Sequence, residues 1–452
     1  MLSIIVRTKN EERWIAPCLK AIFEQSYKDF EVIIVDNCST DGTVVKAKQY
    51  PVKIVTIEDY LPGKSLNVGI EASKGEYLVF LSGHCIPTNG DWLQNLINAF
   101  TEDDIAGVYG RQEPMNFSSP QTKRDLLIVF GLDRRVQVED PFFHNANAII
   151  RRDIWEKYPF DSVVTNIEDR LWASTVQNES YKIVYEPKAS VYHHHGIHHD
   201  GDTQRAHTTV KVIEGFANSL LDYNPGEVNA EKFHTVAFIP VKGQGPLLGD
   251  KKILKFTLRQ AQESKYVKDV FILTDSQETA DFAAEFDVKV PFIRPKELSG
   301  PNVSLDTVYE YSLAKIEALG IHPDLIITLW PSFPFRPKGL IDSLISNLLR
   351  DGYDSMVPGH DAYDSFWIHK EEEYRRLDMG DVPRNLKSPI LIGLNGLGCV
   401  THSEYIRKGR LLGDNVGLMK VTDPLAAVVI REDGVGEKKL EELLFNPKNA
   451  LY

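Results

Sequence analysis

Polar residues suited to bind a nucleotide follow an apolar stretch of the chain at residues 31–36. Asp36 ends the stretch EVIIVD, and Asn37, Ser39, Asp41 and Gly42 follow in the next turn. A carboxylate at such a place can accept hydrogen bonds from a base or a ribose, and the backbone N–H groups of the turn can face a phosphate. Ser39 or Asp41 could instead only cap the helix that comes next. The pattern therefore predicts a nucleotide contact at Asp36 and leaves the role of Asp41 open.

A candidate phosphate contact lies in the segment LPGKSLNVGI, which we expect to be a loop between two strands. Gly63 and Asn67 flank Lys64 and allow the backbone to come close to a ligand, so the ammonium group could pair with a diphosphate. A similar glycine-containing loop, VKGQG, follows the apolar run TVAFIP in the second half of the chain. There Gly243 and Gly245 would let the backbone approach a phosphate.

Short apolar stretches must position these residues. In the first half, residues 3–7, 31–36, 52–57 and 76–81 are rich in β-branched residues and almost continuously apolar. That pattern is typical of strands buried on both faces of a parallel sheet. Helical stretches such as ERWIAPCLKAIFEQS lie between them, so the alternation predicts the α/β class.

The pattern lapses near residues 222–233, where Pro, Gly, Asn and Glu gather, and then restarts. The strand-like stretches of the second half lie at 235–240, 269–274, 287–293 and 324–330. We therefore expect two Rossmann-like nucleotide-binding domains in tandem, at 1–224 and 235–452, joined by a linker at 225–234. Nucleotides bind at the strand ends of such open α/β sheets.

Composition excludes several classes of function. The chain of 452 residues has a net charge of −13 and no cluster of Lys and Arg, which argues against nucleic acid as a partner. It has no apolar run near 18 residues and no signal-peptide pattern at its start, so we expect a cytoplasmic protein without a membrane span. The four cysteines form no C-x-x-C pair, which indicates free thiols rather than a zinc or disulfide framework.

Seven segments of the first half, in order, resemble the motifs of family 2 glycosyltransferases with the GT-A fold, and of the rhamnosyltransferase-like members most of all. They are SIIVRTKNEERWI, VDNCSTDGT, PGKSLNVGI, YLVFLSGH, NANAIIRRDIWEKYPFD, IEDRLWA and YEPKASVYHHH, and they cover about residues 1–215. The resemblance implies an inverting transfer of one sugar from a nucleotide-sugar to a hydroxyl group. The acceptor would be a glycan or a lipid-linked saccharide of bacterial surface-polysaccharide synthesis. No Gln-x-x-Arg-Trp motif is present, which favours single additions over chain extension.

The resemblance also assigns roles to residues. Thr8 and Glu11 match residues that line the nucleoside, Asp36 matches the aspartate that pairs with the base, and Lys64 matches the loop near the diphosphate. Asp169 matches the general base that accepts the proton of the acceptor hydroxyl, and Glu168 precedes it in the family's Glu-Asp pair. Acidic residues at this position could also simply suit the start of a helix.

The chain departs from the family at the metal site. Where the family has Asp-x-Asp, which holds the ion that bridges the two phosphates, this sequence has Ser82-Gly83-His84. His84 could bind Mn²⁺, but this motif does not build an oxygen-rich Mg²⁺ site. His193 falls where the family often has a late metal or phosphate ligand. The histidines that follow it could instead form a polar loop that binds metal only by chance: His194, His195, His198 and His199.

The second half, at about 235–450, resembles the CMP-sugar synthetases that activate sialic acid and Kdo. The matching positions are Thr274, Asp275 and Ser276 after a strand, and Pro331, Ser332, Pro334 and Arg336 in a block that helps to hold base and sugar. In the first loop, Lys242, Gly243 and Lys251 are the plausible nucleotide contacts.

The family's C-terminal Asp-x-Asp, which binds Mg²⁺, is missing from LAAVVIREDGVGEKKLEELL, unless Glu432 and Asp433 replace it. We therefore expect a degenerate domain that forms a homodimer. Two alternatives to a single glycosyltransferase remain. One is a bifunctional enzyme whose second half makes a CMP-sugar, and the other is a scaffold with two inactive sites.

Overall fold

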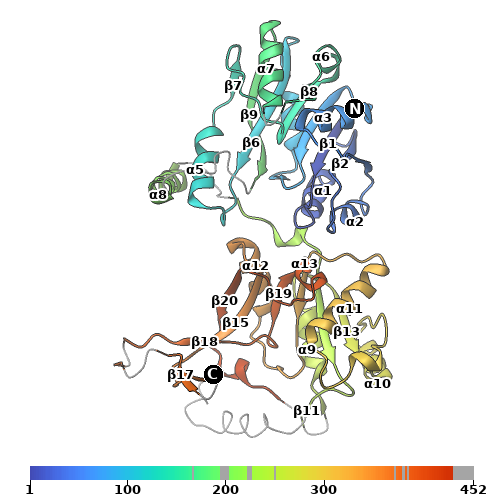
Figure 1. Cartoon of the computed structure of the whole chain (residues 1–452), viewed down its shortest axis with the longest axis vertical. Coiled ribbons are helices and arrows are strands. Elements are labelled where there is room, and N and C mark those ends of the chain that lie inside the picture. The colour runs from blue at the N-terminus through green and yellow to red at the C-terminus, as the bar shows by residue number, and fades with distance from the viewer. Residues whose placement is uncertain are drawn as a thin grey trace. The chain divides into compact units, whose positions relative to one another are not determined.

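The computed structural model describes residues 1–164, 167–193, 203–220, 226–248, 251–370, 373–378, 382–383 and 386–430. Contacts divide the chain into two compact units, Met1–Lys232 and Phe233–Tyr452, each with its own α/β sheet (Figure 1). This confirms the predicted fold class of two α/β domains in tandem. The division falls inside the predicted linker. Within the described residues, no helix is both long and apolar enough to cross a lipid bilayer.

The sheet of the first unit is mixed, whereas the sequence had predicted a parallel sheet. Its strands run in the order β3-β2-β1-β4-β8-β6-β9-β5, with β7 paired to β9. β8 is antiparallel to both β4 and β6, whereas β1, β2, β3 and β4 pair in parallel. The strands are β1 (Leu2–Thr8), β2 (Phe30–Asp36), β3 (Lys53–Thr56), β4 (Tyr77–Ser82), β5 (Ile86–Pro87), β6 (Ile105–Glu113), β7 (Arg135–Gln137), β8 (Asn147–Arg151) and β9 (Lys182–Tyr192).

Helices cover both faces of this sheet, as the continuous apolar strands predict. Because successive side chains of a strand point to opposite faces, Ile4 belongs to the apolar cluster with α1, and Ile5 belongs to the cluster with α3. Gly69 allows α3 to approach β1, since a Cβ there would lie 2.5 Å from Ile5 Cγ2. The helices are α1 (Ile15–Phe23), α2 (Thr43–Ala47), α3 (Pro62–Glu71), α4 (Trp92–Asn98), α5 (Pro120–Val129), α6 (Arg152–Lys157), α7 (Glu168–Asn178) and α8 (Thr203–Leu220).

The carboxyl ends of the parallel strands meet at one edge of the sheet. Thr8 at the end of β1 pairs with Asp36 at the end of β2, and Ser82 ends β4 opposite Arg7. β8 runs the other way, so its first residue, Asn147, also lies at this edge. We call this the strand-end edge of the first unit.

Part of the predicted linker packs on the first unit. The backbone N–H of Asn116 donates to Gly226 O at 2.6 Å, and Lys20 Nζ donates to Glu231 O at 2.8 Å. A short 3₁₀ helix, η1 (Ala230–Lys232), contacts α1. Residues 226–232 are therefore not a free tether, because their backbone carbonyls accept hydrogen bonds from the first unit.

The second unit is built around a mixed sheet in the order β13-β10-β14-β19-β15-β18, with β20 on β15. The predicted strand at 287–293 is wrong. Lys289 forms only an isolated bridge to Phe271, and Pro291 and Pro295 cannot donate to a sheet. The strands are β10 (Thr235–Val241), β11 (Leu247–Leu248), β12 (Lys251–Lys252), β13 (Val267–Thr274), β14 (Leu325–Thr328), β15 (Ser355–Ala362), β16 (Trp367–Lys370), β17 (Glu373–Arg376), β18 (Ile390–Gly393), β19 (Cys399–His402) and β20 (Val416–Lys420).

Helices pack on this second sheet as well. Ser304 caps α11 with its hydroxyl, which accepts from Thr307 N, and Gly352 ends α12 in the left-handed conformation that favours glycine. The helices are α9 (Leu254–Gln262), α10 (Gln277–Ala284), η2 (Lys296–Leu298), α11 (Leu305–Ala318), α12 (Leu340–Asp351), α13 (Ser403–Arg407) and η4 (Pro424–Ala427).

Candidate functional site

Asp36 lies buried at the strand-end edge, and protein groups hold its carboxylate. Thr8 Oγ1 donates to Oδ1 at 3.1 Å, and Ser39 donates to the same oxygen through its hydroxyl at 2.6 Å. The backbone N–H of Ser39 donates to Oδ2 at 2.9 Å. Thr8 and Ser39 therefore fix the orientation of the carboxylate. The predicted base contact at Asp36 stays a prediction.

Asp41 organises the turn before α2. Its Oδ1 accepts from Thr43 N at 3.0 Å and from the Thr43 hydroxyl, and its Oδ2 accepts from Glu12 N at 3.1 Å. These contacts tie the turn after β2 to the loop after β1. The N-cap residue of α2 is Gly42 and not Asp41, so these are contacts within the turn, and the nucleotide role of Asp41 stays a prediction.

Lys64 lies in the first turn of α3 and not in a loop. The sequence interpretation missed that Pro62 favours the first position of a helix. Lys64 Nζ is 3.9 Å from Asp59 Oδ2, a long ion pair between exposed side chains. The contact of Lys64 with a diphosphate stays a prediction.

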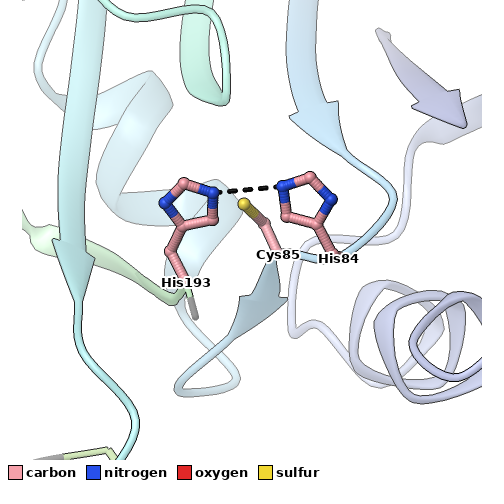
Figure 2. A group of neighbouring side chains, drawn as sticks. All are labelled: His84, Cys85 and His193. Atoms are coloured by element: carbon pink, nitrogen blue, oxygen red, sulfur yellow. Dashed lines mark hydrogen bonds between the residues drawn. The ribbon is translucent and has the colours of Figure 1, made fainter. Parts of the chain in front are cut away.

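The turn after β4 brings Glu11, His84 and His193 together. Gly83 fits closely against β1, because a Cβ there would lie 2.7 Å from Thr8 Cγ2. His84 Nδ1 lies 2.6 Å from Glu11 Oε1, and His84 Nε2 lies 3.1 Å from His193 Nε2 (Figure 2). The two imidazole rings are nearly parallel, with 14° between their planes. The two histidines that the sequence selected thus lie in contact, although 109 positions separate them.

Cys85 completes a group of three metal-ligating side chains, which the sequence analysis missed. Its sulfur and the ligand nitrogens of His84 and His193 all lie within 4.8 Å of one another. Cys85 is fully buried, and burial raises the pKa of its thiol well above the usual value. The signal was present in the sequence, since Cys85 directly follows His84, but a search for paired cysteines does not find it.

Glu168 and Asp169 begin α7, so they lie at a helix start as the sequence suggested, and they contact groups at the strand-end edge. Glu168 is buried, and its Oε1 lies 3.5 Å from Arg7 Nη1 and 3.4 Å from Asn145 Nδ2. Asp169 Oδ2 accepts from Asn145 N at 3.4 Å, and its Oδ1 accepts from Arg170 N at 2.8 Å. Burial raises the pKa of Asp169, although these two N–H groups and Arg7 act in the opposite direction.

His144 is a second titratable group here that sequence reasoning missed. Its Nδ1 lies 3.0 Å from Gln112 Nε2 and accepts from Ala146 N at 3.3 Å. Burial lowers the pKa of His144 to about 4, and the positive charge of Arg7 contributes to the shift. His144 is therefore neutral at physiological pH. It directly precedes Asn145, which contacts both Glu168 and Asp169.

In the second unit, Gly243 and Asp275 meet at the ends of β10 and β13. Gly243 N donates to Asp275 Oδ1 at 2.8 Å, and buried Arg294 lies 3.7 Å from Asp275 Oδ2. Burial alone would raise the pKa of Asp275, but these contacts outweigh it and lower the pKa overall. A cavity of about 250 Å³ opens beside them; its lining includes Lys242, Arg294, Trp330, Pro331 and Ser332.

Arg336 does not face this cavity with a free guanidinium group. Its nitrogens donate to five protein acceptors: Leu397 O, Thr257 Oγ1, Gln260 Oε1, Trp330 O and Gly396 O. Burial lowers its pKa to about 9. Arg336 thus joins α9 to the loop before β19. The contact of Arg336 with a ligand stays a prediction. The side chain of Lys251 is not described. Six further residues selected from the sequence lie outside the described residues: Glu432, Asp433, His194, His195, His198 and His199.

Two family models match the chain. Residues 3–159 match glycosyl transferase family 2, and residues 246–374 match the cytidylyltransferase family. The chain carries a family 2 glycosyltransferase domain. It carries a cytidylyltransferase domain after it. Both resemblances drawn from the sequence are thereby confirmed.

Two curated relatives match the family 2 domain. The chain is similar to the O-antigen chain rhamnosyltransferase WbaN of Salmonella anatum, with 27% identity over 43% of this chain and 66% of that protein. It is also similar to the glycosyltransferase AglE of Haloferax volcanii, with 27% identity over 41% of this chain and 64% of that protein. The chain thus spans just under two thirds of the length of these relatives.

A solved structure, the mannosyltransferase PcManGT of Pyrobaculum calidifontis in complex with GDP-Man and Mn²⁺, aligns with 49% of this chain and 76% of its own length. The identity is 18% and the TM-score is 0.35. The family assignment rests on the sequence matches and not on this alignment.

Proposed function

We propose that the family 2 domain transfers one sugar from a nucleotide-sugar donor to a hydroxyl group of a glycan or lipid-linked acceptor, in the assembly of a surface polysaccharide or glycoconjugate. The observation that carries the proposal is the position of Asp169. Its carboxylate begins α7 and contacts Asn145, just before β8, at the strand-end edge that also holds Asp36 and His84. A base and a nucleotide contact at one edge are what an inverting transfer requires.

In this mechanism the Asp169 carboxylate accepts the proton of the acceptor hydroxyl as its oxygen attacks the anomeric carbon. The bond to the nucleotide diphosphate breaks on the opposite face of the sugar, so the configuration inverts. Burial raises the pKa of Asp169, which makes the carboxylate a better proton acceptor near neutral pH. Glu168, held by Arg7 and Asn145, positions the first turn of α7.

The diphosphate needs compensating charge, which the family obtains from a metal ion on Asp-x-Asp. Here Ser82 and His84 stand at those positions, so the carboxylate pair that suits Mg²⁺ is missing. An imidazole and thiol group suits a transition metal instead.

Replacing Asp169 by Asn tests the proposal. Transfer should fall by about 100-fold or more, since a general base contributes that much, whereas donor affinity should stay within about threefold. The matched control is Asp153→Asn, which removes an exposed carboxylate that pairs with Arg151 at 2.7 Å. Donors can first be found by thermal shift with UDP, GDP, dTDP and CMP. An Asp169→Asn protein with near-normal turnover would exclude this residue as the base.

A second function is favoured by the cavity beside Arg294. Lys242 and buried Arg294 supply positive charge there, next to the backbone of the glycine loop. We infer that the second unit binds a cytidine nucleotide but does not activate a sugar. Calorimetry with CTP and CMP should show binding that Arg294→Gln weakens. Pyrophosphate release from CTP with Mg²⁺ and an eight- or nine-carbon acidic sugar should be absent. Detectable CMP-sugar would establish the bifunctional alternative.

A further inference from the structure

The group formed by His84, Cys85 and His193 has the composition of a transition-metal site. The imidazole nitrogens face each other across 3.1 Å, and Cys85 Sγ lies within 4.8 Å of both (Figure 2). Two of the residues come from the turn between β4 and β5, and the third directly follows β9. The sheet itself brings them together, because β5 pairs with the end of β9 at Ile86 and Tyr192.

Glu11 gives His84 the tautomer that a metal ligand needs. A carboxylate oxygen accepts hydrogen bonds, so the 2.6 Å contact with Glu11 Oε1 forms with His84 Nδ1 as the donor. With that arrangement, His84 Nε2, which lies 3.1 Å from His193 Nε2, is the nitrogen that would bind an ion. Histidines that bind a metal almost always donate their second N–H to a carboxylate or a carbonyl in this way.

The spacing of the ligand atoms fits one ion. A tetrahedral ion with metal–nitrogen distances of about 2.0–2.1 Å holds two imidazole nitrogens about 3.3 Å apart. The observed separation is 3.1 Å, so the rings need only a small shift. Without metal, the same separation is a hydrogen bond between the rings. The sulfur reaches bonding distance by a side-chain movement on the order of 1 Å.

We propose that His84, Cys85 and His193 bind a transition-metal ion of the zinc type, with Glu11 as the residue that orients His84. Nitrogen and sulfur ligands select such ions and reject Mg²⁺ and Ca²⁺. Three protein ligands leave one position of a tetrahedral ion for another molecule, as in catalytic zinc sites. An oxygen of the donor diphosphate has the right chemistry for that position. This last step rests on the proposed function, whereas the metal site itself does not.

Cobalt titration of the full chain tests the site directly. Co²⁺ should bind one per chain, with visible ligand-field bands of a four-coordinate ion and a near-ultraviolet thiolate-to-cobalt band. Cys85→Ser should remove the thiolate band, and His193→Ala should weaken Co²⁺ binding by at least about 100-fold. Glu11→Gln should weaken it by about 10–100-fold, as expected for a residue that orients a ligand. Far-UV circular dichroism in EDTA checks that each variant is folded.

The matched control replaces His194, His195, His198 and His199 together by Ala. These residues follow the site in sequence, so they could bind cobalt by themselves. The proposal expects this variant to keep the one-to-one cobalt spectrum. It is overturned if the wild type shows no thiolate band, or if the control variant loses binding while Cys85→Ser and His193→Ala keep it.

Inorganic pyrophosphate tests the open position. Added to the cobalt form, it should shift the ligand-field bands without removing the thiolate band. Unchanged bands would overturn the diphosphate contact and leave the metal site standing. The transferase proposal is judged separately, by turnover of Asp169→Asn, so that failure of either proposal can be recognised.

Discussion

Arg336 in the cytidylyltransferase domain was predicted to contact a ligand, but its hydrogen bonds indicate that it stabilises the fold. Its guanidinium group donates to five protein acceptors at 2.6–3.2 Å, and the residue is 6% exposed. In Arg336→Met, a side chain of similar length keeps most of the packing. Gly396 O and Trp330 O would keep the backbone N–H donors of Trp330 and Phe333, whereas Leu397 O would lose Arg336 Nε.

The size of the effect follows from two opposing terms. Each buried acceptor left without a partner costs about 1–3 kcal/mol, so Leu397 O and Thr257 Oγ1 together cost about 2–6 kcal/mol. Removing the charge recovers its burial cost, and the shift of the Arg336 pKa from 12.5 to about 9 sets that cost at about 5 kcal/mol at most. We expect a net loss of about 2 kcal/mol, which is roughly a 30-fold change in the unfolding equilibrium.

Hydrogen exchange followed by mass spectrometry measures this loss of stability separately for each unit within the whole chain. Protection of slowly exchanging peptides in residues 233–430 should fall by about 30-fold, whereas peptides of residues 1–232 serve as the internal reference. Arg350→Met is the control, because Arg350 is 49% exposed and pairs with its neighbour Asp351, a surface pair worth at most about 1 kcal/mol. Unchanged protection in Arg336→Met, together with weaker CTP binding, would refute the structural role and restore the ligand contact.

Three further outcomes are expected. Folding lowers the pKa of His144 to about 4, so between about pH 6.5 and 4 the unfolded chain binds a proton at His144 that the folded chain does not. The free energy of unfolding should therefore be highest above this pH window and should fall within it, on acidification, by at most about 3 kcal/mol. Urea titrations at several pH values should show a smaller fall for His144→Gln. Gly63→Ala should lower transferase activity and melting temperature together, because its Cβ would lie 1.9 Å from Asp161 O, beside the start of α7; an unchanged melting temperature would contradict this packing. We also expect a homodimer through the second unit, where Trp367 and Tyr374 on the β16–β17 hairpin are 56% and 71% exposed. Light scattering should show a dimer that Trp367→Lys weakens, and a monomeric wild-type protein would refute this expectation.

The strand ends could be predicted because each is fixed by a local pattern. Thr8, Asp36 and Ser82 all follow continuous apolar runs, and parallel pairing then places them at one edge. The predictions failed where two local signals competed. In PGKSL, the glycine suggested a loop, but Pro62 starts a helix; at 287–293 the apolar run suggested a strand, but Pro291 lies inside it.

The contacts that tune the site could not be predicted, because they join residues far apart in the chain. Arg7 lies 161 positions from Glu168, and nothing local in either segment indicates the ion pair. His144 obtains its low pKa from burial first and from Arg7 second, and both depend on the folded unit. Arg336 matched a family position, yet its five acceptors come from three separate segments, and their geometry decides its role.

In the turn after β4, the backbone conformation and the metal preference depend on different residues. Gly83 is constrained by its contact with Thr8, so the turn must keep its shape whatever flanks it. Ser82 and His84 flank it, and in the proposed site the side chains of His84, Cys85 and His193 determine which ion is bound. With His84 aligned by Glu11 toward His193, a site that oxygen ligands would make suitable for Mg²⁺ becomes one for nitrogen and sulfur. In the proposed site, the choice of metal therefore depends on a few side chains, while the strands and the turn keep their backbone positions.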